Sequence, residues 1–383
     1  MFEFQGKLEH LLVPQAYFSP DWFDRERSFI FHRSWMFFCL ADQLAKPDDR
    51  FARDFYGMPV VAWNHNGTLY ALRNVCGHRH SQIVRDGCSQ GETLKCQIHG
   101  WEYDCAGKLS KIPDGRHLRV IKAPDFALGS YRIVKSGPFI FVNMSNDGPE
   151  FEEYLGTLAP EYHRFYDNLR LVNIWTSDHN VNWKIIVENG VESYHVPVVH
   201  PTTFQDFREE EYHDHRLEPT YTRYGDLYPY ESEKTLEALG FRYYINLLIK
   251  NPTQKRFTHT HLFPTFALYY GDIYSALNLV EPLGPERTRF TSYSFVPDDV
   301  RWGVFGTALQ KMSMPLFVRK FKQILTEDAS LWLAVQKGLK ASVHRGVISA
   351  REERVYAFQR YIVEQLGMDL PLEDTEDLCL PSI

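Results

Sequence analysis

The sequence lacks a long apolar run and has few cysteines. No stretch approaches the roughly 18 consecutive apolar residues that a membrane-spanning helix needs. The first residues, MFEFQGKLEHLLVPQAYF, show no basic start followed by an apolar segment, which is how a secretory signal begins. Six cysteines in 383 residues are too few for a disulfide scaffold. We therefore expect a cytoplasmic protein that does not enter a membrane.

An excess of basic charge is also missing. Lys and Arg number 42 against 49 Asp and Glu, so the net charge is −7, whereas a nucleic-acid-binding protein usually has a basic excess. Repeats, low-complexity segments and Gly/Ser-rich linkers are absent as well. The chain does have the length of two or three domains. It is also rich in aromatic residues, with 27 Phe, 22 Tyr and 8 Trp, which suit bulky cores and apolar pockets.

The pattern of apolar residues predicts an α+β fold in which strands and helices are segregated. The N-terminal part is predicted to be helical up to about Cys39, and residues 53–144 to form strands with a hairpin turn at Asn66-Gly67. Chain breakers at 145–149 indicate a domain boundary. The later segments are predicted to be a helix over 182–195 that Pro197 stops, antiparallel strands over 265–297, and long helices over 301–340 and 349–366.

Cysteine and histidine are paired twice within a short stretch. Cys76-x-His78 is followed, after seventeen residues, by Cys96-x-x-His99. A structural zinc site is one interpretation, because zinc takes Cys and His tetrahedrally, although zinc motifs more often place two cysteines in one knuckle. One Cys and one His in each loop instead favour a two-iron cluster, in which one iron takes both sulfurs and the other takes both ring nitrogens.

A second group of candidate ligands lies in the segment NWKIIVENGVESYHVPVVHP. If 182–195 is helical, Glu188, Glu192 and His195 lie near one face of the helix. After Pro197 the chain can bring His200 back towards His195. Two histidines and a carboxylate from further along the chain would form the triad that holds Fe(II) and leaves positions open for O2 and substrate.

Together these motifs resemble the Rieske non-haem iron oxygenases over nearly the whole chain. The run GWEYD after His99 is typical of that family, as is an E/D-x-x-H-x(4)-H pair, which Glu192, His195 and His200 satisfy. The resemblance implies a Rieske [2Fe–2S] cluster and a mononuclear Fe(II). The implied ligands are Cys76, His78, Cys96 and His99 for the cluster, and His195, His200 and Asp328 for the iron.

The third iron ligand has more than one candidate in the sequence. Asp328 lies in TEDASLWLAVQKGL, which matches an acidic segment of the family, and its neighbour Glu327 is the second choice. Asp214 and Asp226 are weaker candidates because they are predicted to lie in loops.

The resemblance also implies a domain order. We expect a helical segment over 1–40 that packs on the catalytic domain, and an antiparallel β Rieske domain over 41–150. A helix-grip catalytic domain, in which an antiparallel sheet packs with helices, is expected over 151–383.

By the same resemblance, the chain is the terminal oxygenase (alpha) component of a multicomponent system. It would use O2 and take electrons from a reductase or ferredoxin, and so indirectly from NAD(P)H. In this family the two metals of one chain are too far apart for electron transfer, and a homotrimer places the cluster of one subunit beside the iron of the next. An additional β subunit is also possible by this resemblance. Glu192 would bridge His195 to His78 or His99 of the neighbouring subunit, and Asn189 would line the iron site without ligating it.

Three functions follow. The first is hydroxylation of a small aromatic or related organic compound, by mono- or dioxygenation. The second is demethylation or cleavage of a quaternary ammonium compound such as carnitine, choline or betaine. Its support is Glu192. Many aromatic-ring dioxygenases have Asp at that position, whereas some family members that act on quaternary ammonium compounds have Glu. The third, of another class, is a non-catalytic zinc or electron-transfer protein.

The substrate pocket is expected to come from residues 200–275. The aromatic candidates for its lining are Tyr221, Tyr224, Tyr228, Tyr230, Tyr243, Tyr244, Tyr269, Tyr270 and Tyr274. Such rings would cage a trimethylammonium group or stack on a flat substrate. Arg223, Arg242 and Lys250 are candidates for holding a substrate carboxylate.

Overall fold

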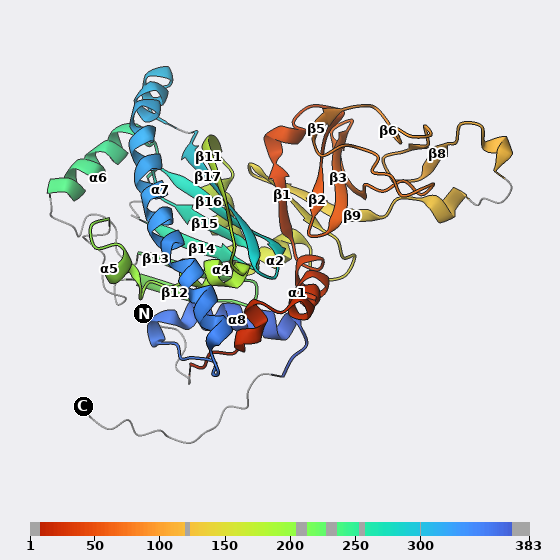
Figure 1. The fold of residues 1–383 in the computed structure, drawn as a ribbon. Helices are drawn as coiled ribbons and strands as arrows, with labels where there is room; N and C mark the ends of the chain where they lie inside the picture. The colour runs from red at the N-terminus through yellow and green to blue at the C-terminus, as the bar shows by residue number, and fades with distance from the viewer. Residues whose placement is uncertain are drawn as a thin grey trace.

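The computed structural model describes residues 8–118, 123–203, 213–226, 236–252, 257–298 and 300–369. Two large antiparallel sheets and one small sheet lie within these residues, and the longest helices accompany the second large sheet (Figure 1). The arrangement confirms the predicted α+β class with a β-rich N-terminal part.

The N-terminal segment is helical for less of its length than the sequence predicts. It forms the short turn η1 (Pro14–Tyr17), helix α1 (Pro20–Glu26) and the π-turn η2 (Arg27–Phe31). The predicted helix is wrong near Cys39, because Met36–Leu40 form strand β1 and are all buried. A short, continuously apolar run has no periodicity that separates a buried strand from a helix.

The first large sheet has the strand order β1-β10-β9-β4-β3-β2-β5. Its other strands are β2 (Asp49–Phe55), β3 (Met58–His65), β4 (Thr68–Arg73), β5 (Gly87–Gln90), β9 (Ser130–Ser136) and β10 (Phe139–Asn143). The predicted hairpin is confirmed, since Asn66 and Gly67 join β3 to β4 with φ angles of 52° and 86°. Asn and Gly adopt this left-handed conformation more easily than other residues, and a two-residue hairpin turn requires it.

A small sheet extends from this domain. It consists of β6 (Leu94–Lys95), β7 (Glu102–Tyr103) and β8 (Leu109–Lys111). Figure 1 shows it at the end of the first domain that lies away from the second large sheet.

The second large sheet has the order β11-β17-β16-β15-β14-β13-β12. Its strands are β11 (Leu169–His179), β12 (His213–Leu217), β13 (Tyr221–Asp226), β14 (Thr258–Leu262), β15 (Phe266–Tyr270), β16 (Ser275–Gly284) and β17 (Arg287–Pro297). The strands predicted over 265–297 are confirmed. The loops predicted around Asp214 and Asp226 are wrong, because these residues lie in the paired strands β12 and β13.

Helices pack against both faces of this sheet. The helices of this half are α2 (Phe151–Leu155), α3 (Ala159–Tyr166), α4 (Trp183–Val191), α5 (Val196–Val199), α6 (Leu236–Leu248), α7 (Val304–Ala341) and α8 (Glu353–Gln365). Helix α4 contacts β16 and α7, and α7 also contacts β11 (Figure 1). The two long C-terminal helices are therefore where the sequence predicts them.

Helix α4 ends earlier than predicted. Its last residue is Val191, and Glu192 is extended, with φ −116° and ψ 165°. Pro197 does not stop this helix but lies in the first turn of α5. Proline is tolerated there because the first turn of a helix leaves its N–H groups unpaired in any case. The break after Val191 frees the chain to place His195 and His200 independently of the axis of α4.

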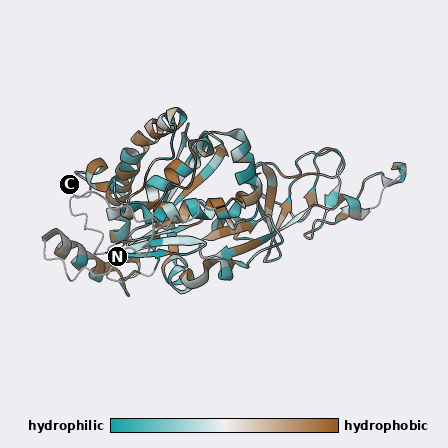
Figure 2. Ribbon diagram, turned by 90° about the horizontal axis from the view of Figure 1, so that it is seen from below, coloured by the Kyte–Doolittle hydropathy of each residue, from teal (hydrophilic) through white to brown (hydrophobic). Residues whose placement is uncertain are grey.

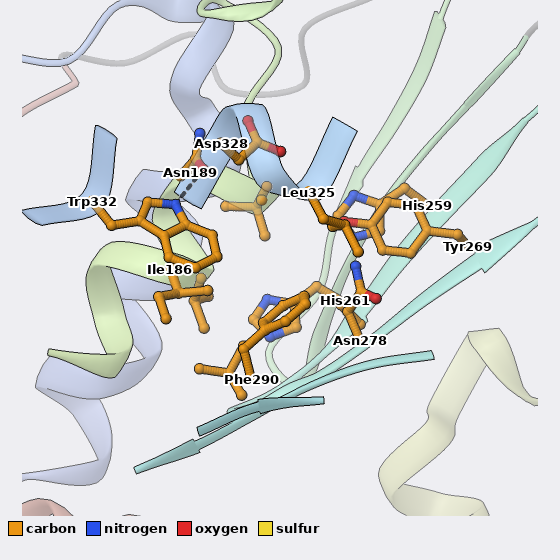
Figure 3. A pocket seen from close by; sticks show the side chains of 15 residues that line it. Ile186, Asn189, His259, His261, Tyr269, Asn278, Phe290, Leu325, Asp328 and Trp332 are labelled. Atoms are coloured by element: carbon orange, nitrogen blue, oxygen red, sulfur yellow. Dashed lines mark hydrogen bonds between the residues drawn. The ribbon is translucent and has the colours of Figure 1, made fainter. Parts of the chain in front are cut away.

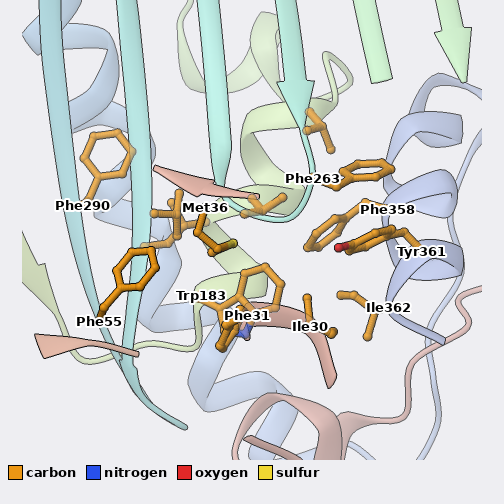
Figure 4. Close-up of a cluster of buried hydrophobic side chains, with 14 of the residues drawn as sticks. Ile30, Phe31, Met36, Phe55, Trp183, Phe263, Phe290, Phe358, Tyr361 and Ile362 are labelled. Carbon is orange, nitrogen blue, oxygen red and sulfur yellow. The ribbon is translucent and has the colours of Figure 1, made fainter. Parts of the chain in front are cut away.

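Aromatic side chains join the two halves of the molecule. One buried cluster combines Phe31, Phe55, Trp183, Phe290 and Phe358, which come from both sheets and from η2, α4 and α8 (Figure 4). A second cluster packs β1 and β10 against the face of the second sheet opposite α4. Ring pairs between β10 and this sheet include Phe141–Phe266 at 5.0 Å and Phe139–Phe295 at 5.5 Å between centroids.

Hydrophilic and hydrophobic residues are interspersed along both the strands and the helices (Figure 2). Among the described residues, no helix combines the length and the apolar character needed to cross a membrane.

Candidate functional site

The first group of predicted ligands lies on two similar loops. Cys76 and His78 follow β4, and Cys96 and His99 lie between β6 and β7. In each loop the carbonyl of the cysteine accepts a hydrogen bond from the amide four residues later, at 3.0 Å from His80 and 2.9 Å from Gly100. The two loops therefore present one thiol and one imidazole each in matching turns. The additional histidine of the first loop, His80, is exposed.

The four side chains form two pairs rather than one convergent set. Nδ1 of His78 lies 3.2 Å from Nδ1 of His99. The thiols of Cys76 and Cys96 are also neighbours. Burial raises the pKa of Cys76, and the nearby Cys96 thiol raises it further. Within the described ranges, three or more Cys, His, Asp or Glu ligand atoms converge to within 4.8 Å at another place only. Separate sulfur and nitrogen pairs suit two irons better than a single tetrahedral zinc.

The surroundings of the pairs differ in polarity. Both cysteines are buried, whereas His99 is exposed and His78 half-buried. The ring of Trp101 stacks on His78, with centroids 5.0 Å apart. The hydroxyl of Tyr103 lies 3.3 Å from Sγ of Cys76 and accepts the Gly77 amide hydrogen at 2.9 Å. The Tyr103 hydroxyl would donate to the sulfur when Cys76 is a thiolate that holds iron, because a thiolate has no hydrogen to give.

The second group converges where α4, α5 and α7 meet. Oδ1 of Asp328 lies 3.0 Å from Nε2 of His200 and 3.4 Å from Nε2 of His195. These three residues are the set whose ligand atoms lie within 4.8 Å of one another. The two Nε2 atoms and one carboxylate on one side of a cavity are the donor set that Fe(II) takes in oxygenases.

A second carboxylate stands behind each histidine. Glu192 contacts Nδ1 of His195 and accepts its backbone amide at 3.1 Å, while Oε2 of Glu327 lies 2.7 Å from Nδ1 of His200. Both contacts leave Nε2 directed at Asp328. Such outer carboxylates fix the ring and make its other nitrogen a better ligand. The geometry accordingly favours Asp328 over Glu327 as the third ligand.

Two polar residues hold Glu327 in turn. The hydroxyl of Thr203 donates to its carboxylate at 2.9 Å, and Nε2 of Gln323 donates to it at 2.8 Å. The other acidic candidate with a described side chain, Asp214, lies away from the site and pairs with Arg223 at 3.2 Å.

The carboxylates dominate the protonation of these histidines. Burial lowers the pKa of His195, but its hydrogen bonds to Asp328 and Glu192 outweigh burial and raise the pKa to about 9. Burial likewise raises the pKa of Asp328, and the bonds from His195 and His200 outweigh it and lower the pKa below its usual value. A proton and a metal ion would therefore compete for the same Nε2 atoms.

Glu188 does not share a face with Glu192 and His195, contrary to the sequence prediction. Its carboxylate accepts the Tyr17 hydroxyl at 2.6 Å, so it holds the N-terminal segment to α4. Asn189, on the next position, does reach the site. Its Nδ2 lies 3.5 Å from Nδ1 of His195, and its Oδ1 accepts the Trp332 indole N–H at 2.7 Å.

A pocket with a cavity volume of about 40 Å³, partly open to solvent, adjoins Asp328 (Figure 3). Its lining comes from α4, α7 and the second sheet. The fifteen lining residues are Ile186, Val187, Asn189, Gly190, Val191, His259, His261, Ala267, Tyr269, Asn278, Val280, Phe290, Leu325, Asp328 and Trp332.

The predicted pocket residues are mostly elsewhere. Of the nine tyrosines, Tyr269 lines the pocket, and Tyr228 and Tyr230 lie outside the described residues. Arg223 is buried in ion pairs with Glu161 and Asp214, and neither Arg242 nor Lys250 is among the lining residues. The histidines of β14 were missed. Their alternation with threonines in THTHL was the available signal, since alternate residues of a strand share one face.

Comparison with family models gives two matches. Residues 34–122 match the Rieske [2Fe-2S] domain, and residues 166–368 match the ring hydroxylating alpha subunit (catalytic domain). The second match alone covers more than half of the chain.

Three similar proteins illustrate the range of relatives. The large subunit of 2-halobenzoate 1,2-dioxygenase from Burkholderia cepacia is 31% identical over 198 residues, which are 46% of this chain and 41% of that protein. Glycine betaine monooxygenase oxygenase subunit from Chromohalobacter salexigens is 27% identical over 57% of this chain and 49% of its own. The chain thus spans less than half of these two relatives. The carnitine monooxygenase oxygenase subunit from Acinetobacter pittii is 25% identical over 86% of this chain and 85% of its own.

Solved structures share the fold at low identity. A quaternary ammonium Rieske monooxygenase in complex with an inhibitor has a TM-score of 0.72 at 20% identity and covers 92% of this chain and 94% of its own. Naphthalene 1,2-dioxygenase from Rhodococcus sp., bound to indole, has a TM-score of 0.71 at 19% identity over 93% of this chain and 94% of its own.

Proposed function

The chain belongs to the ring-hydroxylating alpha-subunit family of Rieske oxygenases, and on this premise we propose that it is a terminal oxygenase that oxidises a quaternary ammonium compound. The observation that carries the proposal is the presence of two different ligand sets in one chain. One consists of paired His Nδ1 atoms 3.2 Å apart beside paired cysteines. The other is a triad of His195, His200 and Asp328, of which Asp328 lines an adjoining pocket.

The residues fit the two iron groups. Cys76, Cys96, His78 and His99 would hold the cluster that supplies single electrons, and His195, His200 and Asp328 would hold the iron at which O2 and substrate meet. Inserting one oxygen atom into a C–H bond consumes O2, two electrons and two protons and releases water. A reductase or ferredoxin partner that draws on NAD(P)H would supply the electrons.

The layout of the chain supports a homotrimer with electron transfer between subunits. The cluster loops and the α4–α5–α7 junction lie towards opposite ends of the molecule in Figure 1. Apolar side chains are exposed beside both sites, with Ile98 60% exposed next to His99 and Val198 81% exposed between His195 and His200. A neighbouring subunit that covered both surfaces would bring its cluster to this iron, with Glu192 between its histidine and His195.

Aromatic walls support a quaternary ammonium substrate. Tyr269, Phe290 and Trp332 line the pocket, and an aromatic cage attracts a trimethylammonium group. Burial raises the pKa of Tyr269 well above its usual value, so the ring stays neutral. The carnitine monooxygenase oxygenase subunit, which aligns over 85% of its own length, is named for such a compound.

A second candidate substrate is a small aromatic acid. The same aromatic rings would stack on a flat ring, and the relative with 31% identity is named for 2-halobenzoate.

Peroxide-driven turnover tests the proposal without the unidentified reductase. The iron-loaded protein would be incubated with isotopically labelled hydrogen peroxide and glycine betaine, carnitine, choline, benzoate or 2-chlorobenzoate. We expect a labelled product from a quaternary compound, detected by mass spectrometry, and none from the Asp328→Ala protein. Labelled product from the aromatic acids alone would favour the second candidate, and no product from any compound would contradict both.

A further inference from the structure

The wall of the pocket formed by the second sheet is polar, although it is deeply buried. His259 and His261 lie on β14 and Asn278 on β16, and each is at most 3% exposed. Figure 3 shows them across the cavity from Asn189 and Asp328. The substrate would therefore lie between the metal ligands on one side and these three side chains on the other.

Each of these side chains has a buried polar atom without a hydrogen-bond partner. The atoms are Nε2 of His259, Nδ1 of His261 and Oδ1 of Asn278. Native proteins satisfy most buried polar groups, so unpaired atoms call for an explanation. Three of them on one wall of a cavity indicate that a polar ligand group completes their bonding.

The hydrogen-bonding role of His259 follows from its other nitrogen. Both terminal nitrogens of Arg354 lie 3.4 Å from Nδ1 of His259. A guanidinium donates hydrogen bonds and accepts none, so Nδ1 is the acceptor and Nε2 carries the hydrogen. Burial and the charge of Arg354 lower the pKa of His259 well below its usual value, which keeps this ring neutral.

The Nε2–H of His259 is rigidly held. The ring stacks on Tyr269, with centroids 4.2 Å apart and planes 5° apart. Arg354 behind it is itself fixed by donating to the hydroxyl of Thr222 at 3.2 Å. The pocket therefore has a fixed hydrogen-bond donor backed by a positive charge, while among its described lining residues the charged one is Asp328, on the other side.

We propose that this wall binds a carboxylate of the substrate, with His259 as the specificity-determining donor, so that the opposite end of the substrate faces Asp328. The inference rests on the proposed function and narrows its substrate class to small organic carboxylates, whether the remainder is a quaternary ammonium group or an aromatic ring. Rotation of the Asn278 amide presents its NH2 group to the same carboxylate, since its oxygen and nitrogen exchange places by a half-turn.

Calorimetric binding to the iron-loaded holoenzyme under anaerobic conditions tests the proposal with two matched probe pairs. Glycine betaine is compared with choline, and benzoate with benzamide, so that each pair contrasts a carboxylate with a neutral group. In at least one pair we expect the carboxylate probe to bind at least about tenfold more tightly than its partner. The pair that shows this preference also indicates whether the substrate is a quaternary ammonium acid or an aromatic acid. Equal binding within both pairs, or failure of both carboxylates to bind at millimolar concentration, would overturn the proposal.

Substitutions at the wall locate the preference. His259→Phe keeps a ring against Tyr269 but removes the donor, and we expect it to abolish the carboxylate preference while the two probes without a carboxylate bind as before. His259→Gln places an amide donor near the former Nε2 and should restore most of it. A full preference in the His259→Phe protein would assign the carboxylate to other residues and overturn the proposal.

A second variant guards against a folding defect at His259. Asn278→Asp is nearly isosteric and adds a negative charge to the same wall, so we expect carboxylate binding to weaken at least tenfold while binding of the uncharged benzamide is unaffected; unchanged carboxylate binding would overturn the proposal. The mononuclear iron content of each variant reports that the catalytic half is intact. Because binding is measured without turnover, a carboxylate preference in a protein that oxidises none of the probes would refute the proposed function alone.

Discussion

The two metal sites are built in different ways. The cluster ligands come from two short loops that are close in sequence, and backbone hydrogen bonds within each loop set their positions. The iron ligands come from the break after α4 and from the middle of α7, and carboxylates behind both histidines hold them. The comparison teaches that the first site depends on local chain geometry, whereas the second depends on long-range packing and on acidic residues that touch no metal.

The largest effect should follow loss of the iron ligand that both histidines share. In Asp328→Ala we expect the mononuclear iron to be lost, and turnover to fall by more than roughly 100-fold, since even outer residues of metal sites cost 10–100-fold. The cluster spectrum should be unchanged because the loops are independent of α7. Metal analysis and visible spectroscopy check this, with Asp298→Ala, a substitution of the exposed partner of Arg170, as the control. Full iron content in the Asp328 variant would place the third ligand elsewhere.

Glu192 should separate electron delivery from iron binding. In Glu192→Ala, loaded at saturating Fe(II), we expect both metals to be retained and turnover driven by the reductase to fall by about 10–100-fold. Peroxide-driven turnover should be largely kept, because it needs no electron from a neighbouring cluster. Normal reductase-driven product formation at full metal content would remove the bridging role.

Glu327 should have a smaller effect of a different kind. Its carboxylate orients His200 at 2.7 Å, so Glu327→Ala should weaken iron affinity by roughly 10–100-fold without abolishing binding. Titration with Fe(II) under anaerobic conditions measures this. If the variant were as devoid of iron as the Asp328 variant at saturating Fe(II), Glu327 rather than Asp328 would be the ligand.

The smallest effect should lie at the cluster. Tyr103→Phe removes the hydroxyl at 3.3 Å from Cys76, and a hydrogen bond to sulfur favours the reduced cluster. One such bond contributes about 1 kcal/mol, so the reduction potential should fall by on the order of 40 mV. A redox titration followed by paramagnetic resonance measures the shift, with Tyr131→Phe as the control. A potential that rose would contradict the assigned direction of the bond.

The same contrast decides what the sequence could predict. The spacing of Cys76, His78, Cys96 and His99 defines the loops directly, because all four ligands lie within one local unit. Asn66-Gly67 likewise specifies its hairpin through local backbone preference. The long helices were also predictable, because apolar periodicity over many residues is a strong signal.

The remainder depends on contacts that are distant in sequence. The end of α4 at Val191 was missed because the capping of His195 by the Glu192 side chain overrides a continuous helical pattern. Asp328 could be matched by resemblance, but the placement of Glu327 behind His200 needed the packing of α7. His259 and Asn278 line the same wall of the pocket only because β14 and β16 belong to one sheet, and no spacing in the sequence reveals that.

The iron and acid-labile sulfide content of the purified chain, measured with its paramagnetic spectrum, tests the central claim most directly. The account predicts about three irons and two sulfides per chain, with a rhombic signal after reduction from a cluster that has mixed sulfur and nitrogen ligands. A colourless protein that contains a single zinc ion, and acquires neither colour nor signal on anaerobic iron and sulfide reconstitution, would contradict it.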